Sequence, residues 1–195
     1  MNKPPLYILA GGNSTRFGGD KARYRWRGRP LLRHVVSQFS TVTGPVVVVA
    51  AAADDYRDLE LVTIADRRPG LGPLAGLETA ARHAGAAPLF VLASCDRLGV
   101  RRAWIELLIE RLRRNPARLA AAFFHDGPTR RRIRWEPFPA VFRPAVSGLA
   151  GELLDRGVRV IARLLDEVGV AVNLPAGWES VVDANRPGDL PGGPG

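Results

Sequence analysis

The sequence predicts an α/β fold of three layers, α/β/α, around a mostly parallel sheet with some antiparallel strands. Short apolar runs alternate along the chain with segments whose apolar residues recur at helical spacing. Residues 45–51 (PVVVVAA) form a continuous apolar run, which is typical of a strand buried on both faces. Two apolar runs, 120–124 and 138–142, flank a basic segment and are expected to be strands that pair antiparallel.

In the first half of the chain, residues 5–9 are a short apolar run that leads into a glycine-rich stretch, and we expect the first strand there. A turn at Gly28-Arg29-Pro30 precedes a helix over 31–40, since proline is common at a helix start. The run 45–51 is the second strand. A further short strand over 61–65 ends at Asp66, and the Gly/Pro-rich segment 67–73 then leads into a helix over 74–84.

In the second half, the apolar run 89–93 predicts a core strand that delivers Ser94, Cys95 and Asp96 to its carboxyl end. Apolar residues at helical spacing from Trp104 to Leu112 predict the next helix, which Asn115-Pro116 ends. The remaining expected elements, after the antiparallel pair, are helices over 145–155 and 158–168 and strands over 171–174 and 180–182.

The length of 195 residues and a hydrophobic fraction of 46% suit one domain, expected over residues 1–190, with 191–195 as a disordered tail. The single cysteine, Cys95, excludes an internal disulfide and a four-cysteine metal site. No leader is expected, and no stretch approaches the roughly 20 apolar residues of a membrane span. We therefore expect a cytoplasmic protein with no membrane partner.

The net charge of +9 fits an acidic partner, either nucleic acid or a small polyanion. The basic residues are mostly dispersed, and only residues 130–134 (RRRIR) form a dense run, without regularly interleaved aromatic residues. No nucleic-acid partner is expected. A non-catalytic basic nucleic-acid-binding protein is retained as the alternative from another functional class.

The strongest functional signal is residues 9–21 (LAGGNSTRFGGDK), a glycine-rich loop that directly follows the first strand. Glycines allow a ligand to approach the backbone closely, and a loop with Arg16 and Lys21 is suited to bind phosphate. Arg16 can grip phosphate bidentately, whereas Lys21 offers a compact charge. Among 28 basic residues, only Lys3 and Lys21 are lysines, which favours a specific role for Lys21. The P-loop and dinucleotide-binding patterns are both absent.

Ligands of open α/β sheets bind outside the carboxyl ends of the strands. This rule predicts that one edge of the sheet holds the glycine loop, Asp66, Asp96 and Asp183. Asp96 is a candidate ligand for Mg²⁺, which prefers hard oxygen donors. The alternative for Asp96 is to cap a following helix. For Asp66 the alternative is a surface ion pair with Arg67 or Arg68.

Three histidines and the cysteine receive no chemical role. His34, His83 and His125 lack metal-ligand spacing and are expected at the surface or at helix caps. Cys95 is expected to be a small core residue.

The loop 9–21 resembles the signature loop of nucleotidyltransferases, and its paired glycines before Asp-Lys look most like the molybdenum cofactor guanylyltransferase (MobA) family. Four further segments are similar to family landmarks in the same order: 28–32 (GRPLL), 72–76 (GPLAG), 92–96 (LASCD) and 182–190 (VDANRPGDL). The resemblance implies a Rossmann-type, GT-A-like fold of the nucleotide-diphospho-sugar transferase kind.

The resemblance also implies roles for individual residues. Arg16, Lys21 and Asp96 would be catalytic, and Asp96 would hold Mg²⁺, with Asp183 as a second candidate ligand. The nucleotide-binding residues would be Leu9, Ala10, Gly11, Gly12, Lys21, Asp66 and Asp96. Asp183 and Asn185 stand where the family has two asparagines, and the chain has Ala50 to Ala53 where the family usually places a nucleoside-contacting asparagine.

The implied reaction transfers GMP from GTP to molybdopterin, with or without bound molybdenum, and gives the guanine dinucleotide cofactor and pyrophosphate. Proteins that handle molybdopterin or accept the product are candidate partners, and residues 130–134 either attract the pterin phosphate or form a solvated loop. The nearest alternatives are a cytidylyltransferase acting on the same pterin and an enzyme that charges a sugar or alcohol phosphate. A third is a non-catalytic chaperone of the cofactor.

Overall fold

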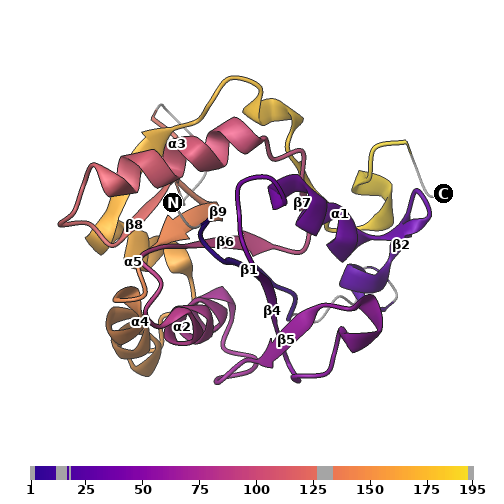
Figure 1. Ribbon diagram of the computed structural model, residues 1–195, viewed down its shortest axis with the longest axis horizontal. Helices are drawn as coiled ribbons and strands as arrows, with labels where there is room; N and C mark the ends of the chain where they lie inside the picture. The colour runs from indigo at the N-terminus through magenta and orange to yellow at the C-terminus, as the bar shows by residue number, and fades with distance from the viewer. Residues whose placement is uncertain (1–2, 12–16, 18, 127–133, 193–195) are drawn as a thin grey trace.

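A central seven-stranded sheet organises the protein (Figure 1), seen in a computed structural model that describes residues 3–11, 17, 19–126 and 134–192. The strand order across the sheet is β10-β8-β9-β6-β1-β4-β5. These strands are β1 (Leu6–Leu9), β4 (Val46–Ala50), β5 (Val62–Ala65), β6 (Phe90–Ser94), β8 (Ala120–Phe124), β9 (Trp135–Phe142) and β10 (Gly169–Asn173).

Only β9 runs against the other strands of this sheet. It pairs antiparallel with both β6 and β8, whereas the β1–β4, β1–β6, β4–β5 and β8–β10 pairs are parallel. The β8–β9 register shifts between Ala122 and Phe123, where β9 contains Pro137 and Pro139. Proline has no N–H to donate, so an irregular position of the ladder suits it. The predicted antiparallel pair is confirmed.

Helices cover both faces of the sheet (Figure 1). One face carries α1 (Leu31–Phe39) and α3 (Arg102–Arg113), and the other carries α2 (Pro73–Ala84), α4 (Val146–Asp155) and α5 (Ile161–Val168). Successive residues of β1 alternate between the two cores, with Leu6 and Ile8 on the α1/α3 side and Tyr7 on the other. The three-layer α/β/α prediction is therefore confirmed.

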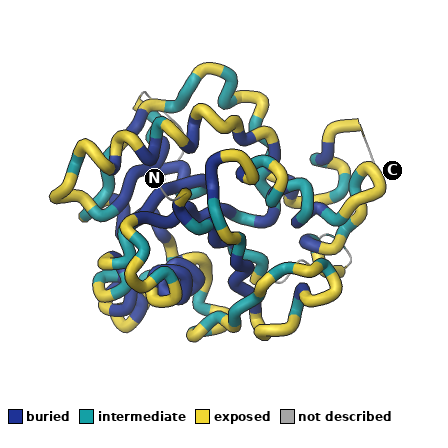
Figure 2. Tube along the Cα trace, viewed as in Figure 1, coloured by how far each residue is buried: buried dark blue, intermediate teal, exposed yellow. Residues whose placement is uncertain are grey.

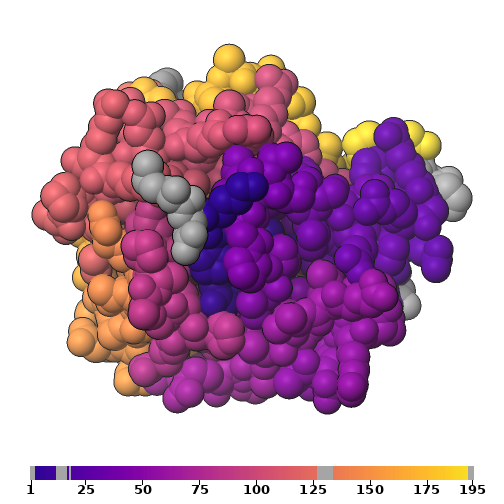
Figure 3. Space-filling model, in the orientation of Figure 1, coloured from indigo at the N-terminus to yellow at the C-terminus, as the bar shows by residue number. Residues whose placement is uncertain are grey.

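The strands in the middle of the sheet are the most buried part of the chain, and exposed residues lie mainly in peripheral helices and loops (Figure 2). In the space-filling view, the indigo N-terminal residues lie at the middle of the face between later segments (Figure 3). This matches the place of β1 between β6 and β4 in the strand order. No helix of the described residues is long and apolar enough to cross a membrane.

Several short elements were not predicted. A hairpin of β2 (Arg25–Trp26) and β3 (Arg29–Pro30) follows the glycine loop. The short strand β7 (Arg97–Leu98) pairs outside the main sheet with β11 (Val182–Asp183), which overlaps the strand expected over 180–182. The 3₁₀-helices are η2 (Lys21–Arg23), η3 (Arg57–Leu59), η4 (Trp178–Ser180) and η5 (Pro187–Asp189).

The strand expected over 180–182 is wrong in its bounds. Ser180 ends η4, and the strand that follows is Val182–Asp183. The short apolar pair Val181-Val182 gives a strand signal, but the tight turn of η4 occupies the residues directly before it.

Candidate functional site

The carboxyl ends of β1 and β6 bring the glycine loop and Asp96 together. These two strands are neighbours in the sheet, with Leu9 opposite Ser94. The backbone N–H of Cys95 donates to the carbonyl oxygen of Leu9 at 3.1 Å, which extends the pairing by one residue. Asp96 therefore leaves the sheet beside the start of the loop.

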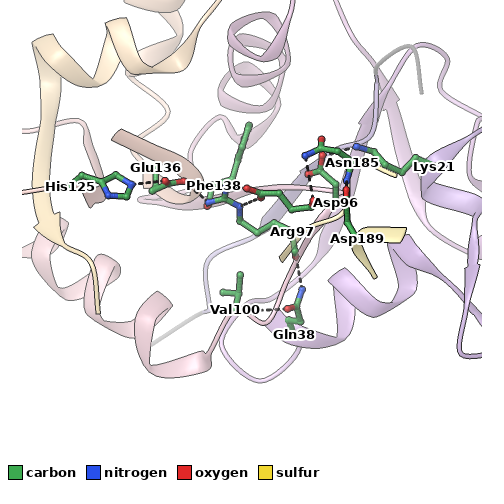
Figure 4. A network of polar contacts seen from close by, with 11 residues as sticks. Lys21, Gln38, Asp96, Arg97, Val100, His125, Glu136, Phe138, Asn185 and Asp189 are labelled. Atoms are coloured by element: carbon green, nitrogen blue, oxygen red, sulfur yellow. Dashed lines mark hydrogen bonds and ion pairs between the residues drawn. The ribbon is translucent and has the colours of Figure 1, made fainter. Parts of the chain in front are cut away.

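Lys21 and Asp96 form an ion pair in this structure (Figure 4). The distance from Lys21 Nζ to Asp96 Oδ2 is 2.6 Å, and the side chains are 16% and 23% exposed. Lys21 begins η2, whose N-cap is Asp20, and the Asp20 side chain accepts a hydrogen bond from the N–H of Ala22. The cap fixes the direction in which Lys21 leaves the backbone.

Tyr56 ties the two ends of the glycine loop together. Its hydroxyl lies 3.2 Å from the carbonyl oxygen of Ala10 and 3.3 Å from Asp20 Oδ1. Burial raises the pKa of Tyr56, and the negative charge of Asp20 raises it further, so the hydroxyl stays protonated and able to donate. Sequence reasoning missed Tyr56, because a tyrosine in a segment between predicted elements carries no periodic signal.

A cavity of about 410 Å³ opens at the same edge of the sheet, beside the carboxyl ends of β1, β4 and β5. Its size falls within the range of about 300–1,000 Å³ that is usual for small-molecule sites. Its lining residues come from these strand ends, the loop that follows β5 and the first turns of α2: Leu9, Gly11, Val49, Ala50, Ala51, Asp66, Pro69, Gly70, Gly72, Pro73 and Gly76. The cavity is mostly apolar, with Asp66 as its charged side chain.

Asp66 is held in the cavity wall by α2. Thr79 Oγ1 donates to Asp66 Oδ1 at 2.9 Å, and the N–H of Arg68 donates to the same oxygen at 3.2 Å. The Arg68 guanidinium pairs instead with Glu78 and Asp155, at 3.1 and 2.5 Å. The structure therefore places Asp66 in the wall of the cavity, and the Arg68 guanidinium does not form the surface ion pair weighed as its alternative.

Asp96 suits a divalent cation that is shared with a phosphate ligand. The residue after it begins β7, and the N-cap of α3 is Arg101, so Asp96 does not cap a helix. Within the described part of the chain, no group of three or more His, Cys, Asp or Glu side chains is placed to hold a metal. Mg²⁺ is commonly bound by one or two carboxylates together with substrate phosphates and water, so the partly exposed Asp96 fits this mode.

The second candidate ligand, Asp183, is engaged by Arg97. Arg97 Nε donates to Asp183 Oδ1 at 2.8 Å and Nη2 donates to Oδ2 at 3.0 Å. The backbone N–H of Asn185 donates to Asp189 Oδ2 at 2.9 Å. The structure thus places both residues beside Asp96, since the N–H of Ala184 donates to the carbonyl oxygen of Asp96 at 2.9 Å.

Some predicted site residues fall outside the described part of the chain. These are Gly12 and Arg16 in the glycine loop, together with residues 130–133 of the basic run. Of the remaining loop residues, Gly11 lines the cavity, and the N–H of Ala10 donates to the carbonyl oxygen of Val49 at 2.9 Å.

The expectations for Cys95 and the histidines have mixed outcomes. Cys95 is buried, as expected of a small core residue. His83 is exposed, but His34 contacts the Trp26 ring and His125 Nε2 lies 2.7 Å from Oε1 of the buried Glu136. The surface or cap expectation therefore holds for His83 but is wrong for His34 and His125, which are only partly exposed and lie 2.7 Å from the Trp26 carbonyl oxygen and from Glu136 Oε1.

This edge of the sheet has an apolar cavity large enough for a nucleoside, and the cation of Lys21 and the carboxylate of Asp96 lie at the same edge. A phosphate chain needs such fixed positive charge, and an apolar wall suits a base. No protein nucleophile is needed for transfer between two phosphates, because an acceptor phosphate is already anionic near neutral pH.

Comparison with known proteins is consistent with this geometry. The chain matches the MobA-like NTP transferase domain over residues 6–170. It is 31% identical over 184 residues to a probable molybdenum cofactor guanylyltransferase of Deinococcus radiodurans, covering 94% of this chain and 90% of the relative. It is 32% identical over 194 residues to a probable molybdenum cofactor guanylyltransferase of Bacillus licheniformis, covering 94% and 92%.

Solved structures share the fold. The crystal structure of molybdopterin-guanine dinucleotide biosynthesis protein A from Archaeoglobus fulgidus has a TM-score of 0.75 at 22% identity, covering 95% of this chain and 94% of that one. A CMP:2-keto-3-deoxy-manno-octonic acid synthetase complexed with CTP has a TM-score of 0.67 at 14% identity, covering 89% and 91%. With the family match over most of its length, the chain belongs to the MobA-like NTP transferase domain family and is a nucleotidyltransferase.

Proposed function

We propose that this protein transfers GMP from GTP to molybdopterin, or to molybdopterin that carries molybdenum, and releases pyrophosphate. Relatives at about 30% identity over most of the chain are named for molybdenum cofactor guanylyl transfer, which supports this activity over other nucleotidyl transfers. We further propose that Mg²⁺ is the cofactor and that the reaction takes place in the cytoplasm.

One observation carries the proposal: the Lys21–Asp96 pair lies at the same sheet edge as the cavity beside β1, β4 and β5. A nucleoside in that cavity would direct its phosphates along the glycine loop that joins β1 to Lys21. Asp66 would accept hydrogen bonds from the nucleoside, since its carboxylate lines the cavity and is oriented by Thr79.

The reaction needs positioning and fixed charge rather than a protein nucleophile. A phosphate oxygen of the pterin attacks the α-phosphorus of GTP in line, a new phosphoanhydride bond forms, and the bond from the α-phosphorus to the bridging oxygen breaks. Pyrophosphate leaves with the electron pair. Lys21 would neutralise charge on the triphosphate, and Arg16 is proposed to act beside it.

Asp96 would hold the divalent cation against the phosphates. When bound, Mg²⁺ supplies Lewis-acid stabilisation of phosphate charge, an effect worth several kcal/mol. Asp96 would contribute its carboxylate as a ligand, at a point beside the start of the loop and 2.6 Å from Lys21 Nζ.

Pyrophosphate release tests the proposal directly. Purified protein is mixed with Mg²⁺, molybdopterin and one nucleotide at a time from GTP, CTP, ATP and UTP. We expect pyrophosphate only when GTP and molybdopterin are both present, with the guanine dinucleotide as product. Release that is independent of molybdopterin, or none with any nucleotide, would overturn the proposal.

A cytidylyltransferase acting on the same pterin is the second candidate, and one feature favours it. At the end of β4 the cavity wall is formed by Ala50 and Ala51, where the family usually has an asparagine, so these residues offer no side-chain amide to a guanine. Thermal unfolding with each nucleotide and Mg²⁺ separates the two, since a ligand at about 100 times its Kd stabilises by about 2.7 kcal/mol. We expect GTP to raise the melting temperature most; a larger shift with CTP would favour the alternative.

A further inference from the structure

Arg97, the residue directly after Asp96, joins three segments of the chain (Figure 4). Its guanidinium forks onto both oxygens of Asp183 on β11, at 2.8 and 3.0 Å. Nη1 also donates to Glu136 Oε2 at 2.8 Å and to the carbonyl oxygen of Phe138 at 2.6 Å, both on β9. The Arg97 side chain is only 11% exposed.

The backbone around Arg97 is held as firmly as its side chain. Gln38 on α1 donates from Nε2 to the carbonyl oxygen of Arg97 at 3.0 Å, and Gln38 Oε1 accepts from the N–H of Val100 at 2.9 Å. On the other side, the N–H of Ala184 donates to the carbonyl oxygen of Asp96 at 2.9 Å. A Cβ on Gly99 would lie 2.9 Å from the carbonyl oxygen of Ser180, which shows how closely the turn after β7 approaches the segment before β11.

We propose that Arg97 is a positioning residue that fixes the carboxylate of Asp96 for the metal–nucleotide complex, and that Asp183 acts through Arg97 rather than as a metal ligand. The inference rests on the proposed function, because it assigns Asp96 to the metal. Asp96 is one peptide bond from Arg97, so the three anchors of the guanidinium also restrain the backbone from which the Asp96 carboxylate extends.

The ionic contacts of Arg97 support this role. Its guanidinium lies 2.8 Å from a carboxylate oxygen of Glu136 and 2.8 Å from a carboxylate oxygen of Asp183. Glu136 is buried, and His125 and Arg97 contact its two oxygens. A buried carboxylate needs such partners. Glu136 on β9 therefore connects Arg97 on β7 with His125, the residue after β8.

The contacts of Arg97 need the planar, forked guanidinium, so substitution by lysine tests whether charge alone is enough. The Arg97→Lys variant keeps the charge but cannot bond both oxygens of Asp183 while also reaching β9. The Arg97→Met variant removes the charge as well, and Asp183→Asn keeps the shape of the partner but loses its charge. Arg102→Met is the matched control, since Arg102 is 62% exposed and pairs with Glu106 on the same helix.

Two readouts separate positioning from a purely structural role. The first is the affinity for Mn²⁺, measured by electron paramagnetic resonance in the presence of a non-hydrolysable GTP analogue. The second is the split between kcat and KM for GTP in the pyrophosphate assay. Circular dichroism and thermal unfolding establish which variants are folded.

For Arg97→Met and Arg97→Lys, we expect Mn²⁺ to bind about tenfold more weakly, the order of effect seen when a partner of a metal ligand is removed. We expect kcat to fall by at least about tenfold and KM for GTP to change by less than about threefold, because misplacement of a ligand affects the transition state most. Arg102→Met should match the unmodified protein. The double variant Arg97→Met/Asp183→Asn should bind Mn²⁺ no more weakly than Arg97→Met alone.

Four results overturn the proposal or the function it rests on. A folded Arg97→Lys or Arg97→Met protein with unchanged Mn²⁺ affinity and kcat overturns the role of Arg97. If Arg97→Met does not fold, the result for Arg97→Lys is the one that tests this role. A further loss of Mn²⁺ affinity in the double variant overturns the role given to Asp183. If the wild-type protein binds Mn²⁺ with the analogue but releases no pyrophosphate, the proposed function alone is overturned. If the wild-type protein binds neither Mn²⁺ nor the analogue, both the proposed function and the role of Arg97 are overturned.

Discussion

Lys21 Nζ lies 2.6 Å from Asp96 Oδ2, although 75 positions separate the two residues in the sequence. In this structure each charge neutralises the other, and each group is proposed to meet the metal–nucleotide complex. The two side chains are only 16% and 23% exposed, so loss of either partner alone would leave the other charge without a counter-ion. A cation at Asp96 and a phosphate at Lys21 would each replace the lost partner with a charge of the same sign.

Replacement of Asp96 tests its place in that exchange. We expect Asp96→Asn to lower kcat/KM for GTP by at least about a hundredfold, or about 2.7 kcal/mol of transition-state stabilisation, because the charged ligand for the cation is lost. The free energy of unfolding should fall by about 1–3 kcal/mol, since the Lys21 ammonium, which is only 16% exposed, loses its charged partner. Pyrophosphate release and chemical denaturation measure the two quantities.

The matched control for this carboxylate is Glu106→Gln on α3, whose side chain is half exposed and pairs with Arg102. It should leave kcat/KM unchanged. A loss of less than about fivefold in a folded Asp96→Asn would contradict the metal role of Asp96.

Two variants of Lys21, one that removes its charge and one that keeps it, test whether the lysine itself is needed. We expect Lys21→Ala to lower kcat/KM for GTP by about 10- to 100-fold, since a hydrogen bond to a charged group contributes about 1.5–3 kcal/mol. Lys21→Arg should recover only part of this, because the larger planar fork does not replace a compact ammonium held by η2. Lys3→Ala, which removes the other lysine of the chain, is the control and should behave like the unmodified protein.

Cys95 gives a pH-dependent test of burial next to the site. Burial raises the pKa of the Cys95 thiol to about 12, and the neighbouring Asp96 adds to the effect, so at pH 8 roughly one thiol in 10⁴ is ionised. In the unfolded chain, with a pKa near 8.5, roughly a quarter is ionised. We expect a disulfide reagent to modify the folded protein at least about a hundredfold more slowly than protein in guanidinium.

The sign of the pH dependence follows from the raised pKa. The reaction of the folded protein should continue to accelerate with each unit of pH above 9, whereas that of the unfolded chain levels off once its thiol is ionised. A folded-state rate that levels off near pH 9 would show that Cys95 is not held in a buried environment.

The sequence was sufficient to predict most elements of the sheet and the meeting of Lys21 with Asp96. The apolar runs of β1, β4 and β6 are strong signals, and parallel strands necessarily share a carboxyl edge, so residues directly after those strands were expected to converge. The loop pattern added the family, which the comparisons confirm.

The contacts that hold the site were not predictable in the same way. Tyr56 and Arg97 act through side-chain contacts with segments 36 to 86 residues away, and no local spacing signals those distances. The contact of His125 with Glu136 was not foreseen, because it forms across the β8–β9 pair, where a register shift decides which side chains meet. Such contacts depend on register and twist, which are properties of the assembled sheet.

Gly76 on α2 packs directly against the Leu9 side chain at the end of β1, in the wall of the cavity. A Cβ added at Gly76 would lie 2.7 Å from Cδ2 of Leu9, a residue that lines the cavity with Gly76 itself. The Leu9 side chain can turn away, but the adjacent free space is the cavity. We expect Gly76→Ala to raise the KM for GTP by about tenfold or more, since 1–3 kcal/mol is the usual cost of crowding a packed site.

Gly148→Ala on α4, where an added Cβ meets nothing within 4 Å, is the control; it should leave KM unchanged and raise stability by up to about 1 kcal/mol. A Gly76→Ala protein with unchanged KM in the pyrophosphate assay would show that the nucleoside binds elsewhere.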